Sequence, residues 1–392
     1  MTMRAIARSL APVLARLRAA DGRIMADQVA VTGIPAPTGA ESDRARWMAD
    51  RLTESGIRDV HIDVAGNVVG ATGAQNGEAP VVLCAHMDTV FESREPIEVR
   101  REGIRFEAPG ISDNARGLAT LVALARELGG ESVRTARPVL LAATTGEEGL
   151  GDLRGARYLF ESAARGAHAA IALDGPGDER IVNTALGSRR YHVAFRGPGG
   201  HSWGAYGSPN AVQAAAALVV RLSALAERGR PRVAITPSRI SGGETINAIP
   251  ADAWLEVDIR SGDSGELGRL DRELRFAAVA AADGENAARR PGSAPMSVAV
   301  SLIGDRPAGE VPAREAVVAA AVAATQQIGR EPVLTLASTD ANIPISLGIP
   351  AISIGGGGAG GDTHTRSEWF ENRDGTRGVA RALLTVAALA RR

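Results

Sequence analysis

Residues 81–90 read VVLCAHMDTV, an apolar run that ends in His86 and Asp88. Consecutive apolar residues of this kind predict a β-strand covered on both faces, as in a parallel sheet. Residues two apart in a strand point to the same side, so the two polar side chains would lie together at its end. Because an imidazole or a carboxylate is costly to bury without a partner, this strand end indicates a site for a metal ion.

Similar polar residues follow two more apolar runs, with Glu147 and Glu148 after the first and Asp174 directly after the second. The predicted elements alternate in the order strand 81–85, helix 114–128, strand 139–143, helix 156–164 and strand 169–173. This alternation predicts an α/β fold with a mainly parallel, mixed sheet and helices on both of its faces. Sites in such folds lie beyond the carboxyl ends of the strands, where these side chains stand.

A different pattern begins after residue 187. The predicted order is strand 191–195, helix 210–227, strands 233–240 and 253–259, helix 267–282 and strand 297–303. This order is the split unit of ferredoxin-like α+β sandwiches. The first pattern resumes with helix 314–328, strands 333–336 and 350–354, and helix 375–390. We therefore predict a first domain over 1–188 and 304–392, with a second domain inserted over 189–303.

Composition narrows the function further. The chain has 392 residues and a net charge of -1, which gives no reason to expect nucleic acid or an anionic membrane as a partner. Its one cysteine, Cys84, excludes an internal disulfide framework. The longest apolar runs are too short to span a membrane, and the N-terminus has helical spacing rather than the apolar core of a signal peptide. We predict a cytoplasmic protein.

Each motif has an ordinary structural alternative when it is taken by itself. His86 and Asp88 could be a polar pair at a strand end, and Asp113 could cap the helix that follows it. His364 could be a loop residue after the glycine-rich run 355–361. Five segments that offer hard carboxylates and two imidazoles favour a metal site instead. Such a ligand set suits Zn²⁺, with Co²⁺ and Mn²⁺ as alternatives.

With HMDTV at 86–90, SDN at 112–114, TGEEG at 145–149 and DTH at 362–364, the chain resembles a known enzyme family. It is similar to the co-catalytic zinc peptidases that include peptidase T, acetylornithine deacetylase, succinyl-diaminopimelate desuccinylase and glutamate carboxypeptidase. The resemblance spans nearly the whole chain and points to the peptidase T-like branch. It implies two Zn²⁺ ions in a zinc-exopeptidase-like fold, with 1–188 and 304–392 as the catalytic domain and the insert over 189–303 as a lid or dimerisation domain.

The resemblance also implies a role for each residue of the site. His86 and Asp174 would bind one metal, Glu148 and His364 the other, and Asp113 both. Asp88 would fix the tautomer of the His86 imidazole. Glu147 would be the general base toward a water whose pKa two metals, roughly 3.5–4 Å apart, lower toward about 7. In this family the peptide bond after the bridging Asp is typically cis.

The insert contributes Gly199-Gly200-His201-Ser202. By resemblance, His201 would reach the active site of a partner subunit and donate to the developing oxyanion, so we predict a homodimer formed through the insert. The alternative is a turn histidine that caps the following helix. Asn247 and Arg260 would bind substrate, although a strand-end Arg is often only solvated. Backbone N–H groups of the glycine run, Gly357 among them, would bind a substrate terminus unless the run is a hinge.

The reaction expected from this resemblance is hydrolysis of an amide bond in short peptides. The ligand at Asp174 is Asp in the peptidase T-like aminopeptidases, whereas Glu is usual in the carboxypeptidases and deacylases. The alternative is an N-acyl-amino-acid deacylase with the same metal machinery. A catalytically silent binding relative is a third reading, and its sign would be the loss of Glu147, a metal ligand or His201. All of these residues are present.

Overall fold

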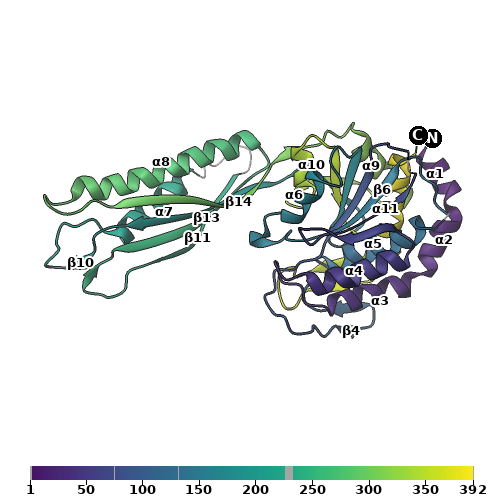
Figure 1. The fold of residues 1–392 in the computed structure, drawn as a ribbon, viewed down its shortest axis with the longest axis horizontal. Helices are drawn as coiled ribbons and strands as arrows, with labels where there is room; N and C mark the ends of the chain where they lie inside the picture. Colours follow the sequence, from purple (N-terminus) through teal and green to yellow (C-terminus); the bar gives the residue numbers. More distant parts are fainter. Residues whose placement is uncertain (1, 75, 131, 226–232, 392) are drawn as a thin grey trace. The chain divides into compact units, whose positions relative to one another are not determined.

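The chain divides into two units in the computed structural model, which describes residues 2–74, 76–130, 132–225 and 233–391. The first unit comprises residues 1–185 and 310–392, and the second comprises 186–309. Figure 1 shows a sheet flanked by helices in the first unit and helices beside a smaller sheet in the second. The predicted insert, 189–303, lies within the second unit.

The first unit is built on a nine-stranded sheet. Its spatial order is β1 (Arg58–Ile62), β2 (Val68–Gly73), β6 (Pro138–Thr144), β3 (Val81–His86), β7 (Ala169–Leu173), β17 (Ala351–Ile354), β8 (Arg180–Ala185) and β15 (Gly309–Glu310), with β16 (Val333–Ala337) paired to β8. The central strand β3 runs parallel to both β6 and β7, and β17 runs parallel to β7. The predicted mainly parallel centre is confirmed.

Apolar residues on alternate positions of the strands face two different cores. Val81, Leu83 and Ala85 pack with the larger core on one face of the sheet, whereas Val82 and Cys84 pack with a smaller core on the other. The helices of this unit are α1 (Met3–Ser9), α2 (Ala11–Ala19), α3 (Asp21–Thr32), α4 (Ser42–Glu54), α5 (Ala115–Leu128), α6 (Arg154–Glu161), α9 (Ala316–Gln327), α10 (Asn342–Ser346) and α11 (Thr376–Leu389). Burial on both faces of the sheet explains why its central strands β3, β6 and β7 are almost entirely apolar.

The second unit is an antiparallel sheet with the strand order β11-β13-β9-β14. Its elements are β9 (Gly187–Arg196), β10 (Gly200–His201), α7 (Ala211–Leu225), β11 (Val233–Gly242), β12 (Ala248–Ile249), β13 (Asp252–Ser261), α8 (Ser264–Ala288) and β14 (Ser297–Arg306). Alternate residues of β9 and β13 share one apolar core with α7 and α8. This is the predicted ferredoxin-like arrangement. The predicted end of the first helix, at Glu227, lies outside the described residues.

Several short elements have no counterpart in the predicted pattern. A four-stranded sheet contains β4 (Arg100–Glu102), β5 (Arg105–Glu107), β18 (Ala359–Gly361) and β19 (Trp369–Glu371), and each of these strands has three residues. Strands of three residues are too short to show a two-residue hydrophobic period. The helix α4 begins at Ser42, and Glu41 stands at its cap position.

Cys84 is a buried free thiol in the middle of β3, with a strand hydrogen-bonded on each side. Burial raises its pKa well above the ordinary value. Among the residues that the structure describes, no helix has the length and apolar character required to cross a membrane.

Candidate metal centre

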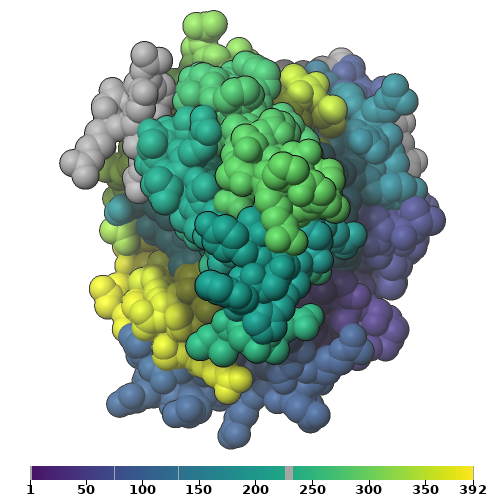
Figure 2. Space-filling view, turned by 90° about the vertical axis from the view of Figure 1, so that its left-hand side faces the viewer, coloured from purple at the N-terminus to yellow at the C-terminus, as the bar shows by residue number. Residues whose placement is uncertain are grey.

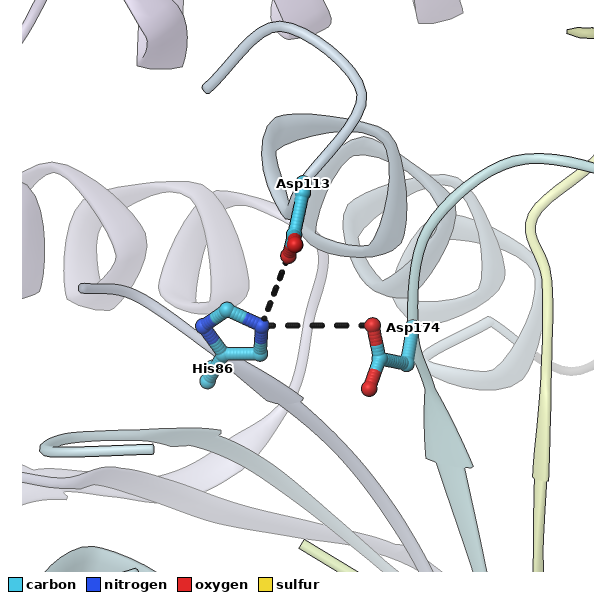
Figure 3. Close-up of side chains that lie close together, drawn as sticks. All are labelled: His86, Asp113 and Asp174. Atoms are coloured by element: carbon cyan, nitrogen blue, oxygen red, sulfur yellow. Dashed lines mark hydrogen bonds and ion pairs between the residues drawn. The ribbon is translucent and has the colours of Figure 1, made fainter. Parts of the chain in front are cut away.

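The ends of two neighbouring strands bring the first predicted ligands together (Figure 3). His86 closes β3 and is 2% exposed, and Asp174 directly follows β7. The His86 Nε2 atom lies 3.1 Å from Asp113 Oδ1 and 4.0 Å from Asp174 Oδ1. Three potential ligand atoms therefore converge on one point beyond the carboxyl ends of the strands.

Asp113 is shared with a second group. Its Oδ2 atom lies 3.2 Å from His364 Nε2, and the same nitrogen lies 2.9 Å from Glu148 Oε1. The candidate ligand atoms of each group, His86–Asp113–Asp174 and Asp113–Glu148–His364, lie within 4.8 Å of one another. Asp113 thus offers one carboxylate oxygen to each side, which is the arrangement expected of a ligand that bridges two cations.

The site brings several acidic groups close together. Burial and the neighbouring carboxylate of Asp113 raise the pKa of Asp174 to about 7. Hydrogen bonds to Asp113 and Glu148 raise the pKa of His364 to about 10. Neighbouring carboxylates contribute to both shifts, because they disfavour the ionised form of Asp174 and favour the protonated form of His364. Three carboxylates and two imidazoles fit a pair of divalent cations such as Zn²⁺.

The tautomer of His86 is set by the backbone. Its Nδ1 atom lies 3.1 Å from the main-chain carbonyl oxygen of Asp88, which can only accept, so Nδ1 carries the proton and Nε2 faces the other ligands. The Asp88 carboxylate, expected in this role, lies farther away at 3.6 Å. Burial alone would raise the pKa of Asp88, but contact with His86 and the N–H groups of Glu148 and Glu147 lowers it to about 2.

Asp88 also holds the loop that follows β6 in place. Its carboxylate accepts the N–H groups of Glu147 and Glu148 at 2.9 Å each and the Thr38 hydroxyl at 2.8 Å. Glu147 is 5% exposed and stands in one cluster with His86 and Glu148. The predicted base is thus fixed through its own backbone. Glu41 also supports this loop, because its carboxylate accepts the N–H group of Gly146 at 3.1 Å.

Asn114 positions the second acid of the first group. The Asp113–Asn114 peptide bond is cis, as the resemblance implies. The Asn114 side chain caps α5 by accepting the Gly117 N–H, so the predicted alternative, a cap formed by Asp113, is wrong. The same amide donates to the carbonyl of Leu173 at 2.9 Å and accepts the N–H of Gly175 at 3.1 Å. It thereby holds the backbone on either side of Asp174.

A buried carboxylate that the sequence analysis missed, Glu368, supports the loop that carries Asp113. It accepts hydrogen bonds from the backbone N–H groups of Gly110, Ser112 and Asp113 and from the Ser112 hydroxyl. The only available signal was an acid four residues after His364, beside the apolar pair at 369–370.

The prediction that Gly357 binds substrate is wrong. Gly357 is buried, and its N–H donates to the carbonyl of Gly177 at 3.0 Å. Its φ of +92° favours glycine, and an added Cβ would stand 2.1 Å from the Gly375 carbonyl oxygen. Close packing against the start of α11 therefore explains this glycine.

The second unit places His201 and Asn247 at one end. His201 in β10 pairs with Ala248, and the Asn247 carbonyl accepts the Ser202 N–H at 2.9 Å. Figure 2 shows this end of the unit from outside, with residues near 200 in teal. His201 Nδ1 accepts the N–H groups of residues 203 and 204 at 3.2 and 3.3 Å. These contacts lie within a turn and leave the proton on Nε2. The predicted alternative, a cap of the following helix by His201, is wrong, because α7 begins at Ala211 and Asn210 accepts the N–H groups of Val212 and Gln213.

Arg260 lies at the other end of the same unit. It pairs with Ser188, close to where the chain enters the unit, and its Nε donates to Asp258 Oδ2 at 2.6 Å. Arg260 is eight residues along β13 from Asp252, which pairs with Arg196 at the His201 end. At 3.3 Å per residue this separation is about 26 Å.

The chain is similar to several known hydrolases in sequence or in structure. Residues 82–388 match the sequence model of peptidase family M20/M25/M40. The aminopeptidase PepT of Bacillus cereus has a similar structure, with 19% identity, a TM-score of 0.76, and coverage of 95% of this chain and 99% of that one.

Two further structures share the fold. One is an amidase of the hydantoinase/carbamoylase family from Burkholderia multivorans, with 18% identity, a TM-score of 0.66 and coverage of 96% and 98%. The other is a dinuclear metal-binding M20 peptidase of Bacillus subtilis, with 15% identity, a TM-score of 0.68 and coverage of 95% and 98%. No curated protein sequence matches the chain.

Proposed function

The chain belongs to peptidase family M20/M25/M40, whose members hydrolyse amide bonds, and we propose that it is a dinuclear metallohydrolase acting on short peptides. The observation that carries this proposal is the sharing of Asp113 between the two groups of candidate ligands. His86 and Asp174 would hold one Zn²⁺, Glu148 and His364 the other, and Asp113 both. Co²⁺ and Mn²⁺ are the alternatives that the ligand set accepts.

The metals, when bound, would activate a water and polarise the substrate carbonyl. Glu147 would take the proton of that water as it attacks and would pass it to the leaving amine nitrogen. Its buried position beside His86 and Glu148 supports this role. The tautomer of His201 supports the other polar role, because an imidazole with its proton on Nε2 can donate to the oxygen that becomes negative.

The geometry of the second unit supports a homodimer. A tripeptide spans at most about 11 Å, so one substrate cannot reach both ends of a strand segment about 26 Å long. His201 and Asn247 of one chain therefore cannot share a substrate with Arg260 of the same chain. We propose that the partner subunit supplies His201 and Asn247, whereas Arg260 of the catalytic chain binds the substrate carboxylate.

A mixture of two inactive variants tests the dimer. Replacing His201 with Ala should lower kcat by about 10²–10³-fold, as loss of an oxyanion donor does. A hybrid dimer of H201A and E147Q chains contains one site with both Glu147 and a partner His201. Subunit exchange should therefore restore about a quarter of the wild-type activity, because half of the dimers in a random mixture are hybrids.

The control for this experiment is H192A, which alters a histidine on β9 of the same unit and should keep wild-type activity. Activity that stays at the sum of the two separate variants, or a fully active monomer in light scattering, would contradict the shared site.

Substrate choice is decided by a panel assayed with Zn²⁺ or Co²⁺. Asp174 and the similarity to PepT support short peptides with a free amino terminus. We expect turnover of tripeptides and dipeptides and little turnover of the same peptides after N-acetylation. The similarity to an amidase supports the alternative, an N-acyl-amino-acid deacylase. Turnover of N-acyl or N-carbamoyl amino acids but not of peptides would establish that alternative. The cytoplasmic location stays a prediction.

A further inference from the structure

We propose that Glu368 is a positioning residue that locks the bridging ligand Asp113 to the segment carrying His364, so that both metal positions depend on one buried carboxylate. This inference rests on the proposed dinuclear function. Glu368 is fully buried, and it accepts three backbone N–H groups and one hydroxyl of the loop over 110–113. Such a carboxylate is costly to bury, so its position indicates a specific role.

The contacts of Glu368 cover the loop that leads into Asp113. One oxygen, Oε1, accepts the Ser112 N–H at 2.8 Å, the Ser112 hydroxyl at 2.7 Å and the Asp113 N–H at 2.8 Å. The other oxygen, Oε2, accepts the Gly110 N–H at 3.1 Å. Hydrogen bonds to an ionised acceptor are about twice as strong as neutral ones. The backbone N–H of the bridging residue is therefore held directly.

The same residue is tied to the other side of the site. Glu368 stands four residues after His364, and its N–H donates to the Thr365 carbonyl at 3.3 Å. The Thr365 N–H in turn donates to the Asp362 carbonyl at 3.1 Å, which closes a turn around His364. The Glu368 carbonyl accepts the Ala108 N–H at 3.0 Å. Two segments that are far apart in the sequence are thus joined: the one that leads into Asp113 and the one that follows His364.

This arrangement predicts a different outcome from the loss of a ligand. Removal of His364 deletes one ligand of one position. Removal of Glu368 releases Asp113, whose two oxygens face both positions, so both should weaken. Loss of a group that orients a metal ligand typically costs 10–100-fold in metal affinity.

The test is titration of the metal-free protein with Co²⁺, followed by visible absorption and by the metal content after gel filtration. Wild type should bind two Co²⁺ per chain. E368A should weaken both binding steps by about 10–100-fold. H364A should weaken one step and leave the other close to wild type. E368Q keeps an oxygen for the three donors at Oε1 but turns its amide toward the Gly110 N–H, so its effect should be smaller than that of E368A. S112A removes only the hydroxyl and should have the smallest effect.

The matched control is D27N, which breaks a partly buried ion pair between Asp27 on α3 and Arg126 on α5. It should lower the melting temperature of the metal-free protein without changing either Co²⁺ affinity. Wild-type affinities in E368A, or an equal loss in D27N and E368Q, would overturn the positioning role. If E368A does not fold, the ranking of E368Q, S112A and D27N decides. Fewer than two Co²⁺ in wild type would instead refute the proposed dinuclear function.

Discussion

Replacing Glu147 with Gln should lower kcat by about 10²–10⁴-fold, the range that a well-placed general base or acid contributes. Gln has nearly the same shape but cannot take a proton from water. The backbone N–H of residue 147 would still donate to Asp88, so the loop should keep its position. KM should change little, because the substrate contacts proposed for Asn247 and Arg260 remain.

The metal content distinguishes loss of the general base from loss of the metal site. The E147Q protein should hold as many metal ions per chain as wild type by elemental analysis, with an unchanged Co²⁺ absorption titration. E161Q, which alters an exposed acid at the end of α6, should keep wild-type activity. Full activity in E147Q would show that another group is the base, and loss of metal would show that Glu147 is a ligand.

Replacing Asp113 with Asn should remove activity through the metals rather than through proton transfer. Asn preserves the side-chain shape but offers one neutral oxygen where two anionic oxygens face His86 and His364. Both metal positions would lose a charged ligand, so the affinity of each should fall by more than the 10–100-fold typical of an orienting group. Turnover measured at micromolar Zn²⁺ should fall to the background rate.

The comparison variant for Asp113 is D174N. Asp174 belongs to the first ligand group, so this change should weaken one binding step and spare the other. A Co²⁺ titration with two steps resolves the difference. Two tightly bound metals in D113N would contradict the bridging role, even if activity were lost.

Much of the fold was predictable because the faces of a strand or helix that are buried determine the spacing of its apolar residues. β3, β6 and β7 are almost entirely apolar since both of their faces are covered, and the second unit alternates because only one face of its sheet meets helices. The same reasoning led to His86, Glu148 and Asp174, because a polar side chain that follows a buried run stands at the edge of the sheet, whereas Asp113 and His364 were assigned as ligands only by the resemblance. The structure brings His86, Asp113 and Asp174 together there, and their roles stay predictions.

The supporting residues could not be predicted in this way. Glu368, Asn114 and Glu41 act by hydrogen bonding to backbone groups of distant loops, and such contacts leave no periodic signal in the sequence. Gly357 shows the opposite error. A glycine run suggests backbone N–H groups open to a ligand, but the structure uses this glycine to bring two segments of backbone close together.

The position of Cys84 gives the protein a built-in reporter of unfolding. The sole sulfhydryl of the chain lies in a central strand, covered by neighbouring strands and by an apolar core. Burial holds its pKa well above the ordinary value, so the reactive thiolate is scarce while the strand stays covered. A thiol-specific alkylating reagent can therefore modify Cys84 only when this sheet opens. The alkylation rate, with and without metal, would count those openings without an introduced label.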